Sequence, residues 1–222
     1  MKIDRRKNYY LMLDTETANT LDDPLVYDIG LAVVDKDGKI YECYSFIIYE
    51  IFCQCKDLMQ TAYYSDKLEN YEDDIANGLR KIVTFATARS VVYRLCNKYN
   101  IKAIIAHNTR FDLNALNTTQ RYITASKKRY FLPYGVALYD TLRMARDTFG
   151  KEKMYCNWCI KNNYVTKYGK PRFTAEIIYR YISGKDDFVE SHTGLEDVFI
   201  EKEIFSACMR KHKKMNKLAF GK

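Results

Sequence analysis

Proline and glycine are scarce in this chain, with three prolines and nine glycines among 222 residues. These residues mark turns and flexible linkers, so we expect turns at separated points and no linker between domains. The sequence also lacks internal repeats and low-complexity segments, which excludes a repeat architecture. A single domain spanning residues 1–222 is therefore expected, and this length can bury a substantial core.

Long hydrophobic runs are absent as well. The N-terminal apolar run YYLML is interrupted by Asp14 before it could form the core of a signal peptide, and no stretch reaches membrane-spanning length. The cysteines are odd in number and scattered rather than arranged as a disulfide framework. We expect a cytoplasmic protein with free thiols and no membrane partner; the cysteines are Cys43, Cys53, Cys55, Cys96, Cys156, Cys159 and Cys208.

Positive charge exceeds negative charge, with 36 Lys and Arg against 28 Asp and Glu, a net charge of +8. This balance favours a polyanionic partner such as nucleic acid. Basic stretches lie at residues 5–7, 127–129 and 209–217, the last within a basic C-terminal tract, 209–222. Each could contact phosphates, or each could be a solvated surface that complements a helix end.

The pattern of apolar residues predicts an α/β fold. Strands are expected at residues 9–13, 26–34 and 40–48, the last two joined by a hairpin at Asp35-Lys36-Asp37-Gly38-Lys39. Residues 51–101 are expected to be mostly helical, with Ile82, Phe85, Ala86, Val92 and Leu95 on one helical face. Strands at 103–106 and 136–139 are each followed by a helix, starting near Thr109 and Thr141. Three antiparallel strands followed by parallel strands, flanked by helices, are thus predicted.

Asp14 and Glu16 are two acids placed where the first predicted strand ends. Residues i and i+2 of a strand project to the same side, so both carboxylates are expected to face one point. Alone, this pair could simply begin a solvated turn. The same ambiguity applies to Asp112, which lies in the first turn of a predicted helix and could simply complement the helix dipole.

A third group lies near the C-terminus, where Thr193-x-x-Glu196 predicts a capping box that starts an amphipathic helix. His192 precedes this helix and Asp197 lies in its first turn. His107 and Asp112 have the same five-residue separation as His192 and Asp197, so either histidine could be a catalytic base on spacing alone.

In order, Asp14-x-Glu16, Asp112 within HNTRFD, and His192-x-x-x-x-Asp197 resemble the DEDDh group of DnaQ-like 3′-to-5′ exonucleases. The resemblance covers residues 9 to about 209, and the segment Asp140-Thr141-Leu142 that follows the second motif is also similar to this family. It implies a ribonuclease H-like fold. It also implies that His192, rather than His107, is the base.

The resemblance further implies a metal-dependent hydrolysis. Four converging carboxylates repel one another by about 4 kcal/mol per pair at about 4 Å and an effective dielectric of about 20, so divalent cations are needed. Oxygen ligands suit Mg²⁺ or Mn²⁺, and two such ions can clamp the attacking and leaving oxygens of a phosphodiester. By resemblance Asp14 would bridge both ions, Glu16 and Asp197 would complete the coordination of the first ion, and Asp112 would act on the second ion.

The expected substrate is the 3′ end of single-stranded DNA or RNA, shortened with release of nucleoside 5′-monophosphates. Relatives contact the terminal nucleotide near positions that match Thr15, Thr17, Asn108 and Phe111. The chain departs from many relatives at Thr17-Ala18-Asn19 and in the long helical segment 49–101, which leaves the substrate open. A polymerase partner or self-association is possible, with nothing in the sequence to support it.

Two other functions stay open on sequence alone. A catalytically silent nucleic-acid-binding module with the same fold would retain binding without cleavage. A protein with a purely structural or interaction role would show no stabilisation by Mn²⁺.

Overall fold

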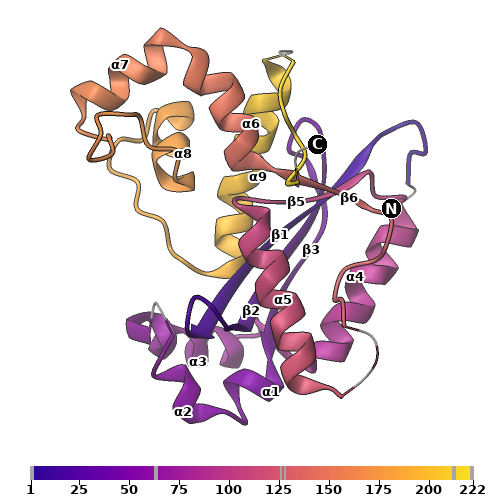
Figure 1. Ribbon diagram of the computed structural model, residues 1–222. Helices are drawn as coiled ribbons and strands as arrows, with labels where there is room; N and C mark the ends of the chain where they lie inside the picture. Colours follow the sequence, from indigo (N-terminus) through magenta and orange to yellow (C-terminus); the bar gives the residue numbers. More distant parts are fainter. Residues whose placement is uncertain (1–2, 63–64, 126, 128, 212–213, 221–222) are drawn as a thin grey trace.

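The computed structural model describes residues 3–62, 65–125, 127, 129–211 and 214–220. A mixed sheet lies at its centre, with six strands in the order β4-β3-β2-β1-β5-β6 (Figure 1). The strands are β1 (Tyr9–Asn19), β2 (Pro24–Asp35), β3 (Ile40–Ile48), β4 (Lys81–Val83), β5 (Ala103–Ala106) and β6 (Ala137–Asp140).

The directions of the strands confirm the expected mixed sheet. β1, β2 and β3 are antiparallel neighbours, whereas β5 pairs parallel to β1 and β6 parallel to β5. The predicted hairpin joins β2 and β3, and Gly38 adopts a positive φ of 81° there, which a residue without a Cβ tolerates. This mixed sheet is the arrangement that the ribonuclease H-like resemblance implies.

Helices cover both faces of the sheet. Each face has its own core, one packed against α1 to α5 and the other against α6 to α9. Figure 1 shows α1, α2 and α3 grouped at one end of the sheet, while α7 and α8 lie beyond α6. The helices are α1 (Tyr49–Phe52), α2 (Lys56–Met59), η1 (Ser65–Lys67), α3 (Leu68–Ala76), α4 (Phe85–Tyr99), α5 (Thr109–Ile123), α6 (Thr141–Thr148), η2 (Phe149–Lys151), α7 (Lys153–Lys161), α8 (Ala175–Ser183) and α9 (Gly194–Arg210).

The segment 49–101 is mostly helical, as predicted, but one part of the prediction is wrong. Residues 81–83 form the edge strand β4, parallel to β3, so Ile82 belongs to a strand and is 43% exposed. Ala86 is exposed on α4, whereas Phe85, Val92 and Leu95 are buried as expected. The spacing of apolar residues assigned Ile82 to the helix that follows, because β4 is too short to show the two-residue period of a strand.

The basic C-terminal tract continues α9 and then returns to the sheet. Arg210 donates to Ser206 at 2.6 Å, and Lys211 bonds Glu152 at 2.8 Å. Leu218 forms a bridge with Tyr139 of β6. His212 and Lys213 of this tract, residues 221–222 and Lys128 of the 127–129 stretch lie outside the described residues.

All seven cysteines are free thiols. Among the described helices, none combines the length and the apolar character needed to cross a membrane.

Candidate active site

Two acids project from β1 toward α9. Side chains alternate along a strand, and Tyr10 and Met12 pack in the core on the α9 side. Asp14 and Glu16 continue this alternation onto the same face. The prediction that the strand ends before Asp14 is wrong, because pairing with β2 continues as far as Asn19. The two acids are therefore held by the sheet rather than by a turn.

The first turn of α9 brings a third acid to this face. Carboxylate oxygens of Asp14, Glu16 and Asp197 lie within 4.8 Å of one another. Asp112 of α5 is 4% exposed and accepts a 2.9 Å hydrogen bond from the hydroxyl of Thr15, which ties it to β1 between the first two acids. We call Asp14, Glu16, Asp112 and Asp197 the acid cluster.

Burial, and then the neighbouring negative charges, make the cluster hard to ionise. Burial raises the pKa of Asp112 to about 7, that of Asp197 to about 8 and that of Glu16 to about 9. The pKa of Asp14 is raised well above its usual range by burial and by the charges of nearby acids. One oxygen of Asp14, Oδ2, is buried without a hydrogen-bond partner among the described residues. The protein alone does not compensate these charges.

His192 lies beside the acid cluster. Ligand atoms of His192, Glu190 and Asp197 fall within 4.8 Å of one another, and Nδ1 of His192 is 3.9 Å from Glu190 Oε2. The backbone of His192 adopts a φ of 54°, a left-handed conformation that side-chain-bearing residues rarely keep unless their surroundings hold it. Ser191 contributes to that environment by donating to Asp197 Oδ1 at 3.3 Å.

His107 has a different environment. Its Nε2 lies 2.8 Å from the carbonyl of Phe173, and its Nδ1 lies 2.9 Å from the hydroxyl of Thr141. Because a carbonyl can only accept, Nε2 carries the proton and Nδ1 accepts from Thr141. Burial lowers the pKa of His107. Both ring nitrogens of His107 are thus engaged by neighbouring residues, although His107 lines the cleft beside Asp14. The ring of His192, in contrast, lies within 4.8 Å of Asp197 of the acid cluster.

The start of α9 is anchored to β2 by Asp28. Its Oδ2 accepts from the backbone N–H of Gly194 at 3.0 Å, from the hydroxyl of Tyr71 at 2.8 Å and from Arg80 at 3.1 Å. Gly30 lets the two backbones touch, since a Cβ at Gly30 would lie 2.1 Å from the carbonyl oxygen of Gly194. The segment that carries His192 and Asp197 is therefore placed by a buried contact with the sheet.

Arg80 connects the long 49–101 segment to this anchor. It is 4% exposed and bonds Asp74 of α3 at 2.9 Å and Glu196 of α9 at 3.0 Å, besides Asp28. Thr193 is the N-cap residue of α9, as predicted, but the capping box is not formed. The hydroxyl of Thr193 donates instead to Oε2 of Glu196 at 2.7 Å. The same oxygen accepts a 3.0 Å hydrogen bond from Arg80, which holds the carboxylate away from the capping position.

A cleft of about 650 Å³ opens beside Asp14. Asn108, the N-cap residue of α5, lines it, and its backbone N–H donates to Asp140 at 3.1 Å. Asp140 also caps α6, which explains locally why an acid ends β6. Thr17 and Phe111 are half-buried and are not part of the cleft lining, so the structure brings only Asp14 and Asn108 of the predicted residues to this wall.

Three acids near the site were missed by the sequence prediction: Asp28, Glu190 and Glu201. Asp28 had a signal, because a charged residue inside the apolar run PLVYDIGLAVV is rarely buried without a partner. Glu201 had one too, since it follows Asp197 by four residues and shares its helix face. Glu190 had none that we recognise.

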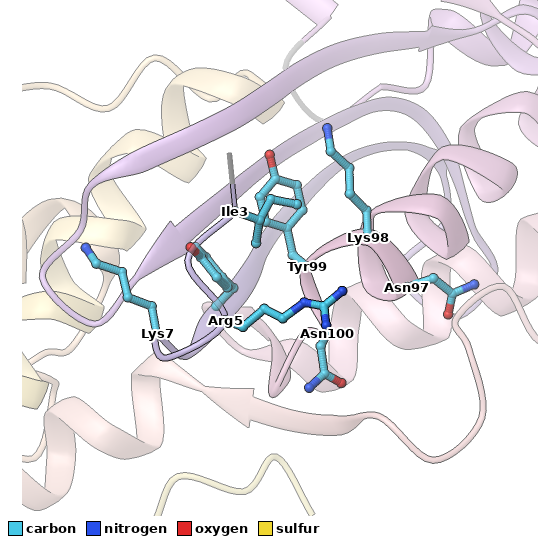
Figure 2. A pocket seen from close by; sticks show the side chains of 8 residues that line it. Ile3, Arg5, Lys7, Asn97, Lys98, Tyr99 and Asn100 are labelled. Carbon is cyan, nitrogen blue, oxygen red and sulfur yellow. The ribbon is translucent and has the colours of Figure 1, made fainter. Parts of the chain in front are cut away.

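A larger hollow, of about 970 Å³, lies near the first residue of β1, well away from the acids. Figure 2 shows Arg5, Lys7 and Lys98 around it, and no carboxylate lines it. Lys7 and Lys98 are already paired with Asp35 and Glu42. The hollow holds no group suited to hydrolysis.

The acid cluster fits divalent metal ions. Its donors are carboxylate oxygens with one nearby imidazole, which suits Mg²⁺ or Mn²⁺. The unpartnered Oδ2 of Asp14 and the raised pKa values indicate that the protein alone disfavours the ionised carboxylates, which a bound cation would stabilise.

No protein-family model matches the chain, and no curated protein matches it. Solved structures do have similar folds. Exonuclease X in complex with 5′ overhanging duplex DNA shares 16% sequence identity at a TM-score of 0.47, over 91% of this chain and 92% of that chain. E. coli exonuclease I in complex with a 5cy-dT13 oligonucleotide shares 13% at 0.49, over 89% of this chain.

Both are exonucleases. The chain spans 39% of the exonuclease I chain. At these identities the likeness concerns how the elements are arranged, and it leaves the activity to be argued from the site.

Proposed function

We propose that residues 1–222 act as one DEDDh-type 3′-to-5′ exonuclease domain of the DnaQ-like family. It would hydrolyse phosphodiester bonds at the 3′ end of single-stranded DNA or RNA and release nucleoside 5′-monophosphates. One observation carries the proposal. Acids that are far apart in the sequence converge to within 4.8 Å on the sheet, with the imidazole of His192 within 4.8 Å of Asp197.

The acid cluster would hold two Mg²⁺ or Mn²⁺ ions. Asp14, Glu16 and Asp197 are near enough to share one ion, and Asp112 would serve the second. Bound ions would supply Lewis acidity at the reacting phosphate and offset the charge of the acids. The hydroxyl of Thr15 would keep the carboxylate of Asp112 in place through its 2.9 Å hydrogen bond.

His192 would accept the proton of the attacking water. A neutral imidazole can accept such a proton. His192 comes from the loop before α9, and a ring nitrogen of it lies within 4.8 Å of a carboxylate oxygen of Asp197. General-base catalysis of this kind typically contributes about 10² to 10⁴ in rate.

The substrate would enter through the cleft beside Asp14. Asn108 lines it, together with Arg146 and Arg172, whose positive charges suit a phosphodiester backbone. Thr17 and Phe111 would contact the terminal nucleotide from β1 and α5, and Thr15 would do so through its backbone. DNA and RNA are both candidates for this cleft.

A gel time course tests the activity. Single-stranded DNA and RNA of matched sequence, labelled at the 5′ end, are incubated with Mn²⁺ and wild-type protein or the Asp14→Asn variant. Stepwise shortening from the 3′ end that vanishes in the variant is expected. Binding of either strand without shortening would instead identify a silent nucleic-acid-binding module.

His192→Ala tests the base. We expect turnover to fall by about 10² to 10⁴ with Mn²⁺ affinity and substrate affinity retained, since the imidazole is not needed to hold the ions. Full turnover in this variant would contradict the assignment.

A further inference from the structure

Glu201 is a buried acid that the exonuclease motifs do not include. It lies on α9 one turn after Asp197 and is 3% exposed. One carboxylate oxygen, Oε1, accepts a 3.1 Å hydrogen bond from the backbone N–H of His107 at the end of β5. The other oxygen, Oε2, is buried and has no hydrogen-bond partner among the described residues. The side chain is thus held in place with one oxygen uncompensated.

Glu201 lines the same cleft as Asp14. Both residues line the 650 Å³ cleft, and each has one buried oxygen without a partner in the described part of the chain. A cation bound between Asp14 and Glu201 would stabilise both unpartnered oxygens.

The protein itself does not supply that group. Among the described residues no ion pair involves Glu201 or Asp14. Arg146 and Arg172 line the cleft, but Arg172 directs its Nε toward the carbonyl of Val165 at 3.0 Å. A buried carboxylate without a compensating partner is destabilising, and a bound cation would remove that cost.

We propose that Glu201 is a fifth acid of the metal centre and supplies Oε2 to the divalent cation that Asp14 holds on the cleft side. The proposal rests on the proposed function for the other four ligands and extends it. The bond from the backbone N–H of His107 fixes Oε1, so a single oxygen is presented to the ion. The centre then carries five carboxylates, which tightens its hold on cations relative to a four-acid site.

Titration calorimetry with Mn²⁺ on the whole chain tests the proposal without measuring activity. Glu201→Gln preserves the acceptor for the His107 N–H and replaces Oε2 by an amide nitrogen, which does not bind metal ions. We expect its Mn²⁺ affinity to fall at least tenfold. The matched control is Glu203→Gln on the same helix, whose side chain is 41% exposed and paired with Lys202; it should stay within twofold of wild type.

A second variant separates a ligand from a distant charge. Glu201→Asp keeps the charge but withdraws the carboxylate by one methylene, so a ligand role predicts weakened Mn²⁺ binding here too. In addition, bound Tb³⁺ should gain one coordinated water in Glu201→Gln, measured from its luminescence lifetimes in H₂O and D₂O. Wild-type affinity in Glu201→Asp, or in Glu201→Gln, would overturn the proposal, as would an unchanged water count.

The outcomes distinguish this proposal from the exonuclease itself. A protein that binds Mn²⁺ through Glu201 but shortens no nucleic acid would refute the exonuclease and leave the fifth ligand standing. An active exonuclease whose Mn²⁺ affinity is unchanged in Glu201→Gln would refute the fifth ligand only.

Discussion

Replacing Asp14 by Asn is expected to stabilise the metal-free protein at pH 8, although Asp14 is the centre of the acid cluster. The carboxylate oxygens of Asp14, Glu16 and Asp197 lie within 4.8 Å of one another. At that separation and an effective dielectric of about 20, Coulomb repulsion is about 3 kcal/mol for each ionised pair. Protons bound by the folded state relieve part of it, so we expect a gain of about 3 kcal/mol in the free energy of unfolding.

The sign follows from the direction of the pKa shifts. The pKa values of Glu16, Asp112 and Asp197 are raised to between about 7 and about 9, whereas unfolded carboxyl groups titrate near 4. Above pH 4 the unfolded chain therefore binds fewer protons than the folded one, and stability falls as the pH rises through about 9. Below pH 4 both states are protonated, and the advantage of Asp14→Asn should disappear.

Thermal unfolding in EDTA at pH 4 and pH 8 measures this. A gain of about 3 kcal/mol corresponds to about 6 to 12 °C for a chain of this length. The control is Asp22→Asn, the same change at an exposed loop residue, which should have little effect. Mn²⁺ at about 100 times its Kd should stabilise the wild type by about 2.7 kcal/mol and the Asp14 variant by much less. A metal-free variant that is no more stable than wild type at pH 8 would refute the electrostatic reasoning.

Two further predictions concern the start of α9. Gly30→Ala should lower the free energy of unfolding, measured by urea titration, by at least about 2 kcal/mol. The reason is that the new Cβ would lie 2.1 Å from the carbonyl oxygen of Gly194. A variant as stable as the wild type would contradict this close approach. Glu196→Gln and Asp74→Asn each remove one partner of Arg80 and should lower the melting temperature alike, but only Glu196→Gln, which frees the first turn of α9, should also reduce turnover and Mn²⁺ affinity. Equal turnover in the two variants would show that Arg80 acts on stability alone.

The sequence was most informative where a local rule operates. The apolar runs correctly located five of the six strands. The glycine of the hairpin located the turn between β2 and β3, and polar residues located the starts of α5 and α6. The two-residue period put Asp14 and Glu16 on one side of β1 because alternation is a property of any strand. The motif order named the acids that converge, while their catalytic roles and that of His192 stay predictions.

The sequence predictions failed where contacts with distant segments determine the local structure. Polar residues after Leu13 suggested that the strand ends, yet β2 continues to pair with β1 as far as Asn19. The capping box at Thr193 was expected from spacing, but Arg80, 116 residues from Glu196 in sequence, takes the glutamate that the box requires.

The sequence by itself determined the mixed α/β order and the residue types of an oxygen-rich acidic centre, since both depend on local period and chemistry. Only the tertiary structure decided how the centre is assembled. It placed Glu201 in the cleft beside Asp14, anchored α9 through Asp28 and Arg80, and engaged both ring nitrogens of His107 with Thr141 and Phe173. These contacts join segments far apart in the chain, and burial makes each of them matter because an uncompensated charge is costly only where water is excluded.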